Sequence, residues 1–232
     1  MPGIKRWCGV TLCLAMTSAL SAAQALQPLT DPDRPVEIPG VRVLPPKGDG
    51  WFLFPVSAQE TVGGRPVPQN GLIRFVRRLS PAPKVEEGRQ IVAAVMVIDS
   101  GHADSWTPEA FLEWPSGRGG QSARSQIGHM VTPRQRLMAY DERLDRAFGE
   151  TCVRYTRVTE EYGQVPTIPD LVVTLSTEGI DCYHPNWPEY IVGVTFQQSY
   201  ARGYAALPLD ADSFLKGLRF TPVRPQPLPP PS

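Results

Sequence analysis

The chain has 232 residues, with 23 Lys or Arg side chains and 23 Asp or Glu side chains. This length is enough for one domain with a substantial core or for two very small ones. Because the charge is balanced, there is no electrostatic case for binding nucleic acid or an anionic membrane surface. The sequence therefore predicts neither as a partner.

The first 25 residues have the pattern of a cleavable secretory signal. Lys5 and Arg6 give a positive start, residues 10–20 are uncharged and mostly apolar, and Ala23 and Ala25 are the small residues that a signal peptidase requires. Cleavage is expected after Ala25, with Ala23 as the alternative. The apolar run is about half of the roughly 20 residues that a membrane span needs. We therefore expect no membrane span and a periplasmic or secreted mature chain.

Proline marks both ends of the expected mature chain and makes up 26 of the 232 residues. Residues 28–46 hold many prolines among few apolar residues, and residues 222–232 read PVRPQPLPPPS. Both segments are predicted to be extended and poorly packed, with polyproline II character. The tail would either bind an aromatic groove or fray. The expected divisions are a signal peptide at 1–25, an extended segment at 26–47, one domain at 48–222 and a disordered tail at 223–232.

Three strands are predicted in the first half of the domain. Residues 51–56 and 72–78 are short apolar runs, and the connection between them contains glycine-rich turn signals. Residues 90–99 form the clearest strand. Because residues 91–98 are apolar on both faces, we expect this strand to lie inside the sheet with both faces covered.

Two short helices are predicted. Thr107 supplies an N-cap hydroxyl, Pro108 fits the first helical position, and Phe111 would point to the core of a helix that ends near residue 115. The second helix starts after Asp210 as its N-cap, and Gly217 is placed to end it.

Residues 132–148 fit two interpretations. Leu137, Tyr140, Leu144 and Phe148 fall at near-helical spacing, whereas a strand over residues 136–142 would pair well with the strand that follows. The strand is slightly favoured. Further strands are predicted at 152–162, 171–182, 190–200 and 219–223.

These elements predict an α+β domain. It would hold a mostly antiparallel sheet of five to seven strands with two short helices packed on its faces.

Two cysteines, Cys152 and Cys182, remain after signal cleavage. An even number in an exported chain indicates a disulfide. Closing a loop of about 30 residues would stabilise the fold by roughly 3 to 4 kcal/mol on the chain-entropy model. A redox pair is the alternative, but such pairs usually have C-x-x-C spacing at the start of a helix.

The three histidines give little evidence for catalysis. His102 lies in the sequence DSGHAD at 99–104, which could be a hydrolytic or metal site, but no G-x-S-x-G elbow is present. His184 lies two residues after Cys182, yet no spacing supplies the other ligands of a zinc site. His129 follows a glycine in a predicted loop and fits no catalytic or metal-binding motif. Glu160 and Glu161 are adjacent on a strand, so they point to opposite faces and cannot act together.

Three short motifs carry a resemblance to a group of proteins. Residues 149–155 (GETCVRY) and 179–185 (GIDCYHP) fit G-x-x-C-V-R-Y and G-x-x-C-x-H-P, and residues 214–220 fit F-L-x-G-L-x-F. Over residues 48–220 the chain resembles an uncharacterised group of exported bacterial proteins. The resemblance implies a disulfide-linked sheet and an αβα sandwich of the PsbP-like kind as one arrangement. It implies no activity.

The sequence as a whole indicates an exported, non-catalytic binding or accessory module of the bacterial envelope. The ligand or protein partner stays unidentified, and no metal or cofactor is predicted. The expected contact site is the rigid loop over residues 183–190, with Tyr183, Trp187 and Tyr190. The alternative is a small envelope hydrolase that uses His102 or His184.

Overall fold

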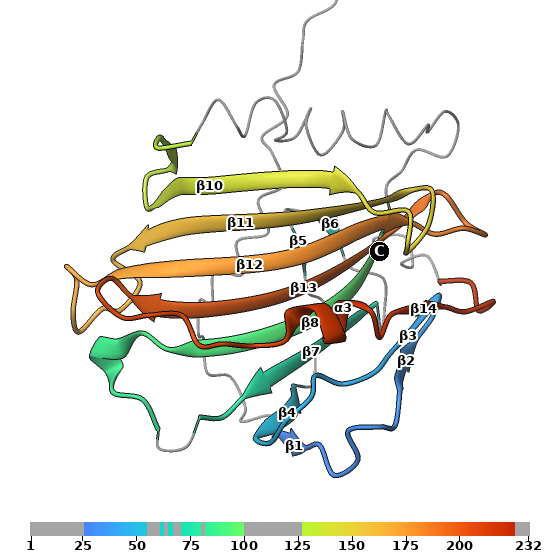
Figure 1. Ribbon diagram of the computed structural model, residues 1–232, viewed down its shortest axis with the longest axis horizontal. Coiled ribbons are helices and arrows are strands. Elements are labelled where there is room, and N and C mark those ends of the chain that lie inside the picture. Colours follow the sequence, from blue (N-terminus) through green and yellow to red (C-terminus); the bar gives the residue numbers. More distant parts are fainter. Residues whose placement is uncertain are drawn as a thin grey trace, which may run out of the picture.

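A large antiparallel sheet forms most of the structure. The computed structural model describes residues 26–54, 61–62, 65–66, 71–79, 82–99 and 127–225. Within them, nine strands form one sheet in the order β1-β4-β7-β8-β13-β12-β11-β10-β9. Every neighbouring pair is antiparallel, and the long strands lie side by side in Figure 1. In sheet order the strands are β1 Gln27–Pro28, β4 Trp51–Phe54, β7 Leu72–Arg77, β8 Gln90–Asp99, β13 Tyr190–Ala201, β12 Val172–Tyr183, β11 Cys152–Tyr162, β10 Gln135–Leu144 and β9 Met130–Thr132.

The remaining elements are short. A second sheet has the order β14-β3-β2, with β14 at Arg219–Phe220, β3 at Val41–Val43 and β2 at Val36–Ile38. Strands β5 (Thr61–Val62) and β6 (Arg65–Pro66) pair with each other. The helical elements of the described residues are a 3-10 turn, η1, at Val85–Glu87, and one helix, α3, at Ala211–Leu215.

The predicted α+β class is wrong. The described chain is nearly all sheet, because five of the strands run for ten to twelve residues and their helical neighbours have three and five residues. The second helix is present as α3, where the Asp210 carboxylate accepts a hydrogen bond from the backbone N–H of Ser213 at 2.9 Å. The helix predicted at 107–114 lies outside the described residues, as do the predicted signal peptide at 1–25 and residues 226–232. Within the described residues, one five-residue helix does not make an αβα sandwich.

The strand predictions are largely confirmed. Residues 90–99 form β8 inside the sheet, between β7 and β13, and residues 152–162 form β11. The ambiguous segment is strand β10, which forms the hairpin with β11.

A β-bulge explains the helix-like spacing in β10. The register shifts between Leu137 and Ala139, so that Leu137, Tyr140 and Leu144 face residues of β11 that share one face of the sheet. The three-residue step from Leu137 to Tyr140 is therefore compatible with a strand.

The main core lies on one face of the large sheet, which we call the apolar face. Alternate residues of β8, among them Val95 and Val97, pack there with α3 and with the small sheet. Figure 1 shows α3 in front of the large sheet. Val41 and Val43 of β3 are fully buried in this core. The predicted poor packing of residues 28–46 is therefore wrong for this part, because β3 alternates Val-Arg-Val and buries both valines.

The predicted disulfide is confirmed. Cys152 and Cys182 lie directly opposite each other on β11 and β12, with their Cα atoms 4.1 Å apart. Both are buried in the main core. The bond is compatible with folding in an oxidising compartment.

Candidate functional site

The predicted contact loop is not an open groove. Tyr183 and Tyr190 are each 2% exposed, so their rings are not available to a ligand. Trp187 packs against the main core and stacks on His184, with 4.4 Å between ring centroids. The aromatic residues singled out by sequence therefore hold the loop in place.

His184 has a structural role in this loop. It is 1% exposed, and its Nε2 lies 2.9 Å from the Gly40 carbonyl oxygen, to which it donates. Its Nδ1 accepts the backbone N–H of Asn186 at 3.2 Å. Burial lowers the pKa of His184 below its ordinary value of 6.5, against the effect of the Gly40 hydrogen bond. A neutral ring with both nitrogens engaged cannot serve as a general base for a substrate.

The other candidates are dispersed. His129 is exposed next to β9, and His102 lies outside the described residues. Glu160 and Glu161 point to opposite faces, as expected. Glu160 pairs with Arg202 at 2.7 Å on one face, and Glu161 accepts from the Gln135 amide at 3.0 Å on the other. These two carboxylates therefore do not form an acid-base pair.

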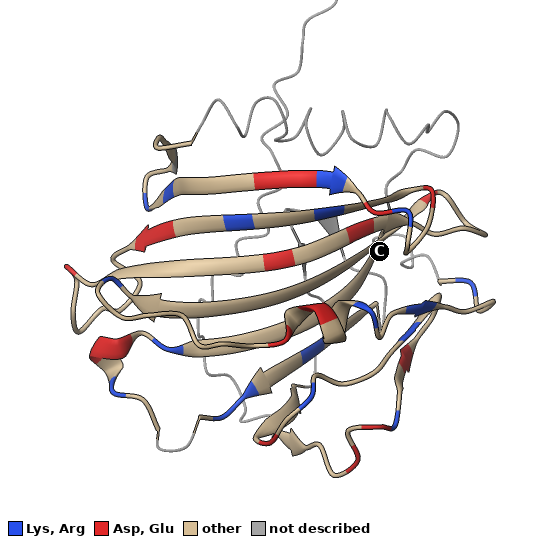
Figure 2. Cartoon of the chain, in the orientation of Figure 1, with Lys and Arg blue, Asp and Glu red and all other residues tan. Residues whose placement is uncertain are grey.

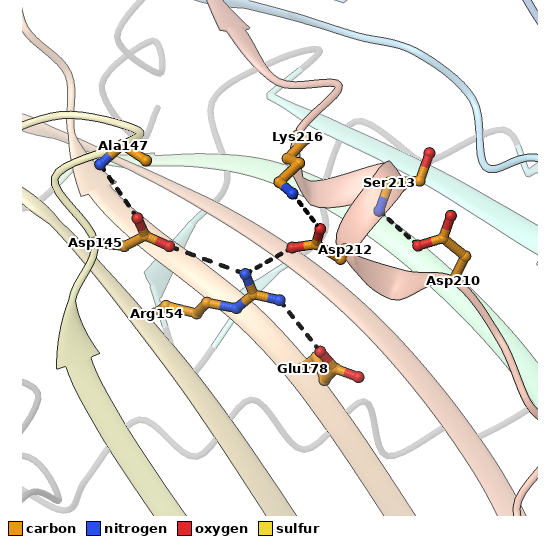
Figure 3. Close-up of polar contacts among 8 residues, drawn as sticks. All are labelled: Asp145, Ala147, Arg154, Glu178, Asp210, Asp212, Ser213 and Lys216. Atoms are coloured by element: carbon orange, nitrogen blue, oxygen red, sulfur yellow. Dashed lines mark hydrogen bonds and ion pairs between the residues drawn. The ribbon is translucent and has the colours of Figure 1, made fainter.

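An ion-pair cluster fastens α3 to the sheet on the apolar side. Arg154 of β11 lies 2.7 Å from Asp212 of α3, 3.5 Å from Glu178 of β12 and 3.9 Å from Asp145 (Figure 3). Lys216 pairs with Asp212 as well. These contacts explain the arginine of the GETCVRY segment without a ligand, since they join the helix to two strands.

The opposite face of the large sheet carries buried polar side chains, and we call it the polar face. Residues that lie directly opposite each other on antiparallel strands share a face. By that rule one row across the sheet consists of Glu142, Tyr155, Gly179, Thr195, Ala94 and Arg74. The next row consists of Tyr140, Arg157, Thr177, Gln197 and Val92. Glu142, Thr177, Thr195 and Arg74 are all buried.

The tyrosines of these rows are Tyr140 and Tyr155. Tyr140 donates to the Glu142 carboxylate at 2.8 Å. Burial, and then that hydrogen bond, raise the pKa of Tyr140, while burial followed by the charge of Asp181 raises the pKa of Tyr155. Both phenols stay protonated at neutral pH. The hydroxyl end of the Tyr155 ring lies against Gly179, where any Cβ would overlap it.

A pocket of about 420 Å³ lies at one end of the polar face. Its floor comes from three neighbouring strands, β8, β13 and β12. One wall is the segment around η1, and the other is the end of β11 with the turn after it. The residues that bear on its chemistry are Val92, Leu175, Gln197 and Ser199 on the floor, Lys84 and Arg89 on the η1 wall, and Glu161 on the β11 wall.

The η1 wall is fixed to the floor. Ser199 donates to the Gly88 carbonyl at 2.8 Å. Gly88 has a φ of 56°, and a Cβ there would lie 3.2 Å from the backbone nitrogen of Ala201. Glycine therefore allows the wall to turn and to approach β13 closely. Arg89 is held by Glu87 at 3.1 Å, with its guanidinium 5.8 Å from the centre of the Tyr204 ring.

Sequence reasoning missed this pocket. It singled out Glu161 as a carboxylate but assigned no role to the segment at 83–89. The available signal was the polar alternation of Thr195, Gln197 and Ser199 along β13, which marks one face of a buried strand as polar.

Charge does not point to a polyanionic partner. Figure 2 shows both signs distributed over the molecule, with strand β13 free of charged residues. Among the described residues, no group of three or more His, Cys, Asp or Glu side chains could hold a metal ion. No helix within the described part of the chain is long and apolar enough to cross a membrane.

No protein-family model, curated protein or solved structure matches the chain.

Proposed function

We propose that the protein is an exported, non-catalytic binding module of the bacterial envelope whose ligand occupies the pocket on the polar face. The pocket itself carries the proposal. Its volume of about 420 Å³ falls in the range of about 300 to 1,000 Å³ that small-molecule sites occupy. Its floor combines aliphatic side chains with the amide of Gln197 and the hydroxyl of Ser199, a mixture that can bind and orient a small ligand.

Export is supported by the signal-like start of the sequence and by the disulfide, which suits a periplasmic or secreted protein. The absence of catalysis is supported by His184, whose two ring nitrogens are both bonded to the backbone. The alternative hydrolase would have to work without this histidine.

The test is a ligand screen by thermal shift on the mature chain, starting at Leu26, with affinities then measured by calorimetry. A ligand present at 100 times its Kd would stabilise the fold by about 2.7 kcal/mol. Leu175→Trp should abolish binding because the indole would fill the pocket. Thr174→Trp is the matched control, since it places the same ring on the opposite face of the same strand.

A ligand that binds Leu175→Trp as tightly as it binds the wild type would show that this pocket is not the ligand site. A hydrolase panel on the same protein tests the other half of the proposal. Robust turnover by the purified mature chain would show that the protein is an enzyme.

A further inference from the structure

We propose that the pocket takes a short peptide with free ends and aliphatic side chains. This inference rests on the proposed function and adds the class of ligand. It starts from the charges, which differ between the two walls. Lys84 and Arg89 line the η1 wall, whereas Glu161 lines the wall formed by β11. A ligand with a carboxylate at one end and an ammonium at the other complements both walls.

The separation of the walls sets the length of the ligand. The η1 segment leads directly into β8, and Glu161 lies on β11, three strand spacings away in the order β8-β13-β12-β11. Three spacings are about 14 Å. Part of that distance is within reach of the side chains of Arg89 and Glu161. A dipeptide of about 7 Å in extended form fits the remaining span better than a single amino acid.

Both charged groups are held in place before a ligand arrives. Arg89 is half-buried, paired with Glu87 and lying against Tyr204. Glu161 is half-buried and bonded to Gln135. Burial raises the pKa of the Glu161 carboxyl, although the Gln135 bond and the Arg157 charge oppose the rise. A ligand ammonium would compensate the desolvation of this carboxylate.

The floor of the pocket indicates which side chains the peptide carries. Val92, Val173 and Leu175 give an aliphatic surface, and none of the described residues that line the pocket is aromatic. Gln197 and Ser199 stand among them, with polar groups that can bond a peptide amide. Among the described lining residues there is no aromatic ring on which a sugar would stack, and a fatty acid has no ammonium group to pair with Glu161.

The experiment is calorimetry on the mature protein with leucyl-leucine, free leucine, N-acetyl-leucyl-leucine and leucyl-leucinamide. Leucyl-leucine should bind best. Acetylation removes the ammonium and amidation removes the carboxylate, so each should weaken binding roughly tenfold, the typical worth of one charge-assisted hydrogen bond.

Two variants locate the ends of the peptide. Glu161→Gln should bind the acetylated and the free peptide equally tightly. Arg89→Gln should bind the amidated and the free peptide equally tightly. Glu160→Gln is the matched control, because it removes the neighbouring carboxylate on the opposite face and should keep both differences. Melting curves of each variant show whether it is folded. If a variant is not folded, the blocked peptides still test the inference on the wild-type protein.

Equal binding of free and blocked peptides by the wild-type protein would overturn the inference. So would binding of free leucine as tight as that of the dipeptide, or failure of all four compounds to bind. If another ligand from the screen is then blocked by Leu175→Trp, only the peptide assignment fails and the pocket stands. If every ligand binds Leu175→Trp as tightly as the wild type, this pocket is not the ligand site and the proposed function fails.

Discussion

The two faces of the large sheet are built from the same strands but differ in chemistry. On the apolar face, Val95 of β8 and Val194 of β13 lie in a core that α3 and the small sheet complete. On the polar face, the neighbouring residues Ala94 and Thr195 stand in a row with Glu142 and Arg74. The period of two along a strand places the main core on one face and the buried polar side chains on the other, beside two small apolar clusters, one around Met96 and one around Ile191.

This division has an energetic consequence. Burial of aliphatic side chains on the apolar face supplies the favourable free energy of folding, at roughly 25 cal/mol per Å² of apolar area. Buried polar groups on the other face add little net stability, because their hydrogen bonds replace those made with water. We therefore expect substitutions to cost more on the apolar face than on the polar face, and four predictions examine that difference.

The largest effect is expected for Val95→Asp. Val95 is fully buried among apolar side chains, so the carboxylate would be unpaired in the core and the protein should not fold. Circular dichroism and solubility after expression measure this. Val95→Ala is the milder companion, with an expected loss of about 2 kcal/mol. A soluble Val95→Asp protein with an unchanged Tm would mean that this face is not the core.

Loss of the disulfide should have the next largest effect. The bond joins residues 30 apart on the apolar face. Its removal in a Cys152→Ser, Cys182→Ser variant should lower the free energy of unfolding by roughly 3 to 4 kcal/mol on the chain-entropy model. Denaturant unfolding measures the loss, and the wild-type protein unfolded with and without a reductant is the control. Equal stability with and without the bond would contradict the prediction.

Much of the sheet could be predicted from sequence, because strong β patterns mark its long strands. Residues 90–99 and 152–162 became β8 and β11 with the predicted bounds. The disulfide followed from the number of cysteines and from the expected oxidising compartment. These features depend on local sequence or on simple counting.

The ambiguity over residues 132–148 and the features that were missed have a different origin. A bulge in β10 changes which residues share a face, and a bulge has no clear sequence signal. Val41 and Val43 were missed because their burial depends on pairing with β14, nearly 180 residues later in the chain. The pocket was missed for the same reason, since its walls meet only after β8, β13, β12 and β11 align.

The third prediction applies one substitution to two adjacent residues on opposite faces. Ala93 lies in the main core, whereas Ala94 lies on the polar face beside a small apolar cluster with Leu72 and Met96, and both alanines are buried. Ala93→Ser should cost about 1 to 3 kcal/mol because its hydroxyl meets apolar neighbours. Ala94→Ser should cost less, because Thr195 and Arg74 lie directly opposite it. Denaturant unfolding of both variants gives the difference, and equal costs would mean that the faces do not differ in polarity.

The smallest effect concerns pH and a buried histidine on the apolar side. His184 packs on Phe220 of β14 and is held neutral, because burial lowers its folded pKa below 6.5. As the pH falls through 6.5, the unfolded chain takes up a proton on this ring before the folded chain does. The free energy of unfolding therefore decreases with falling pH until the folded pKa has also been passed.

Unfolding by denaturant between pH 7.5 and pH 5 measures this decrease. His184→Gln should be less stable than the wild type at pH 7.5, because it loses the ring contacts, but its stability should depend less on pH. His129→Gln is the matched control, because His129 is exposed and its replacement should leave the wild-type slope unchanged. The window stays above pH 5 because Glu160, whose pKa is lowered below 4.5 chiefly by the Arg202 hydrogen bond, contributes its own loss at lower pH. A wild-type slope that survives in His184→Gln would assign the pH dependence to another group and remove the evidence that this histidine is neutral in the fold.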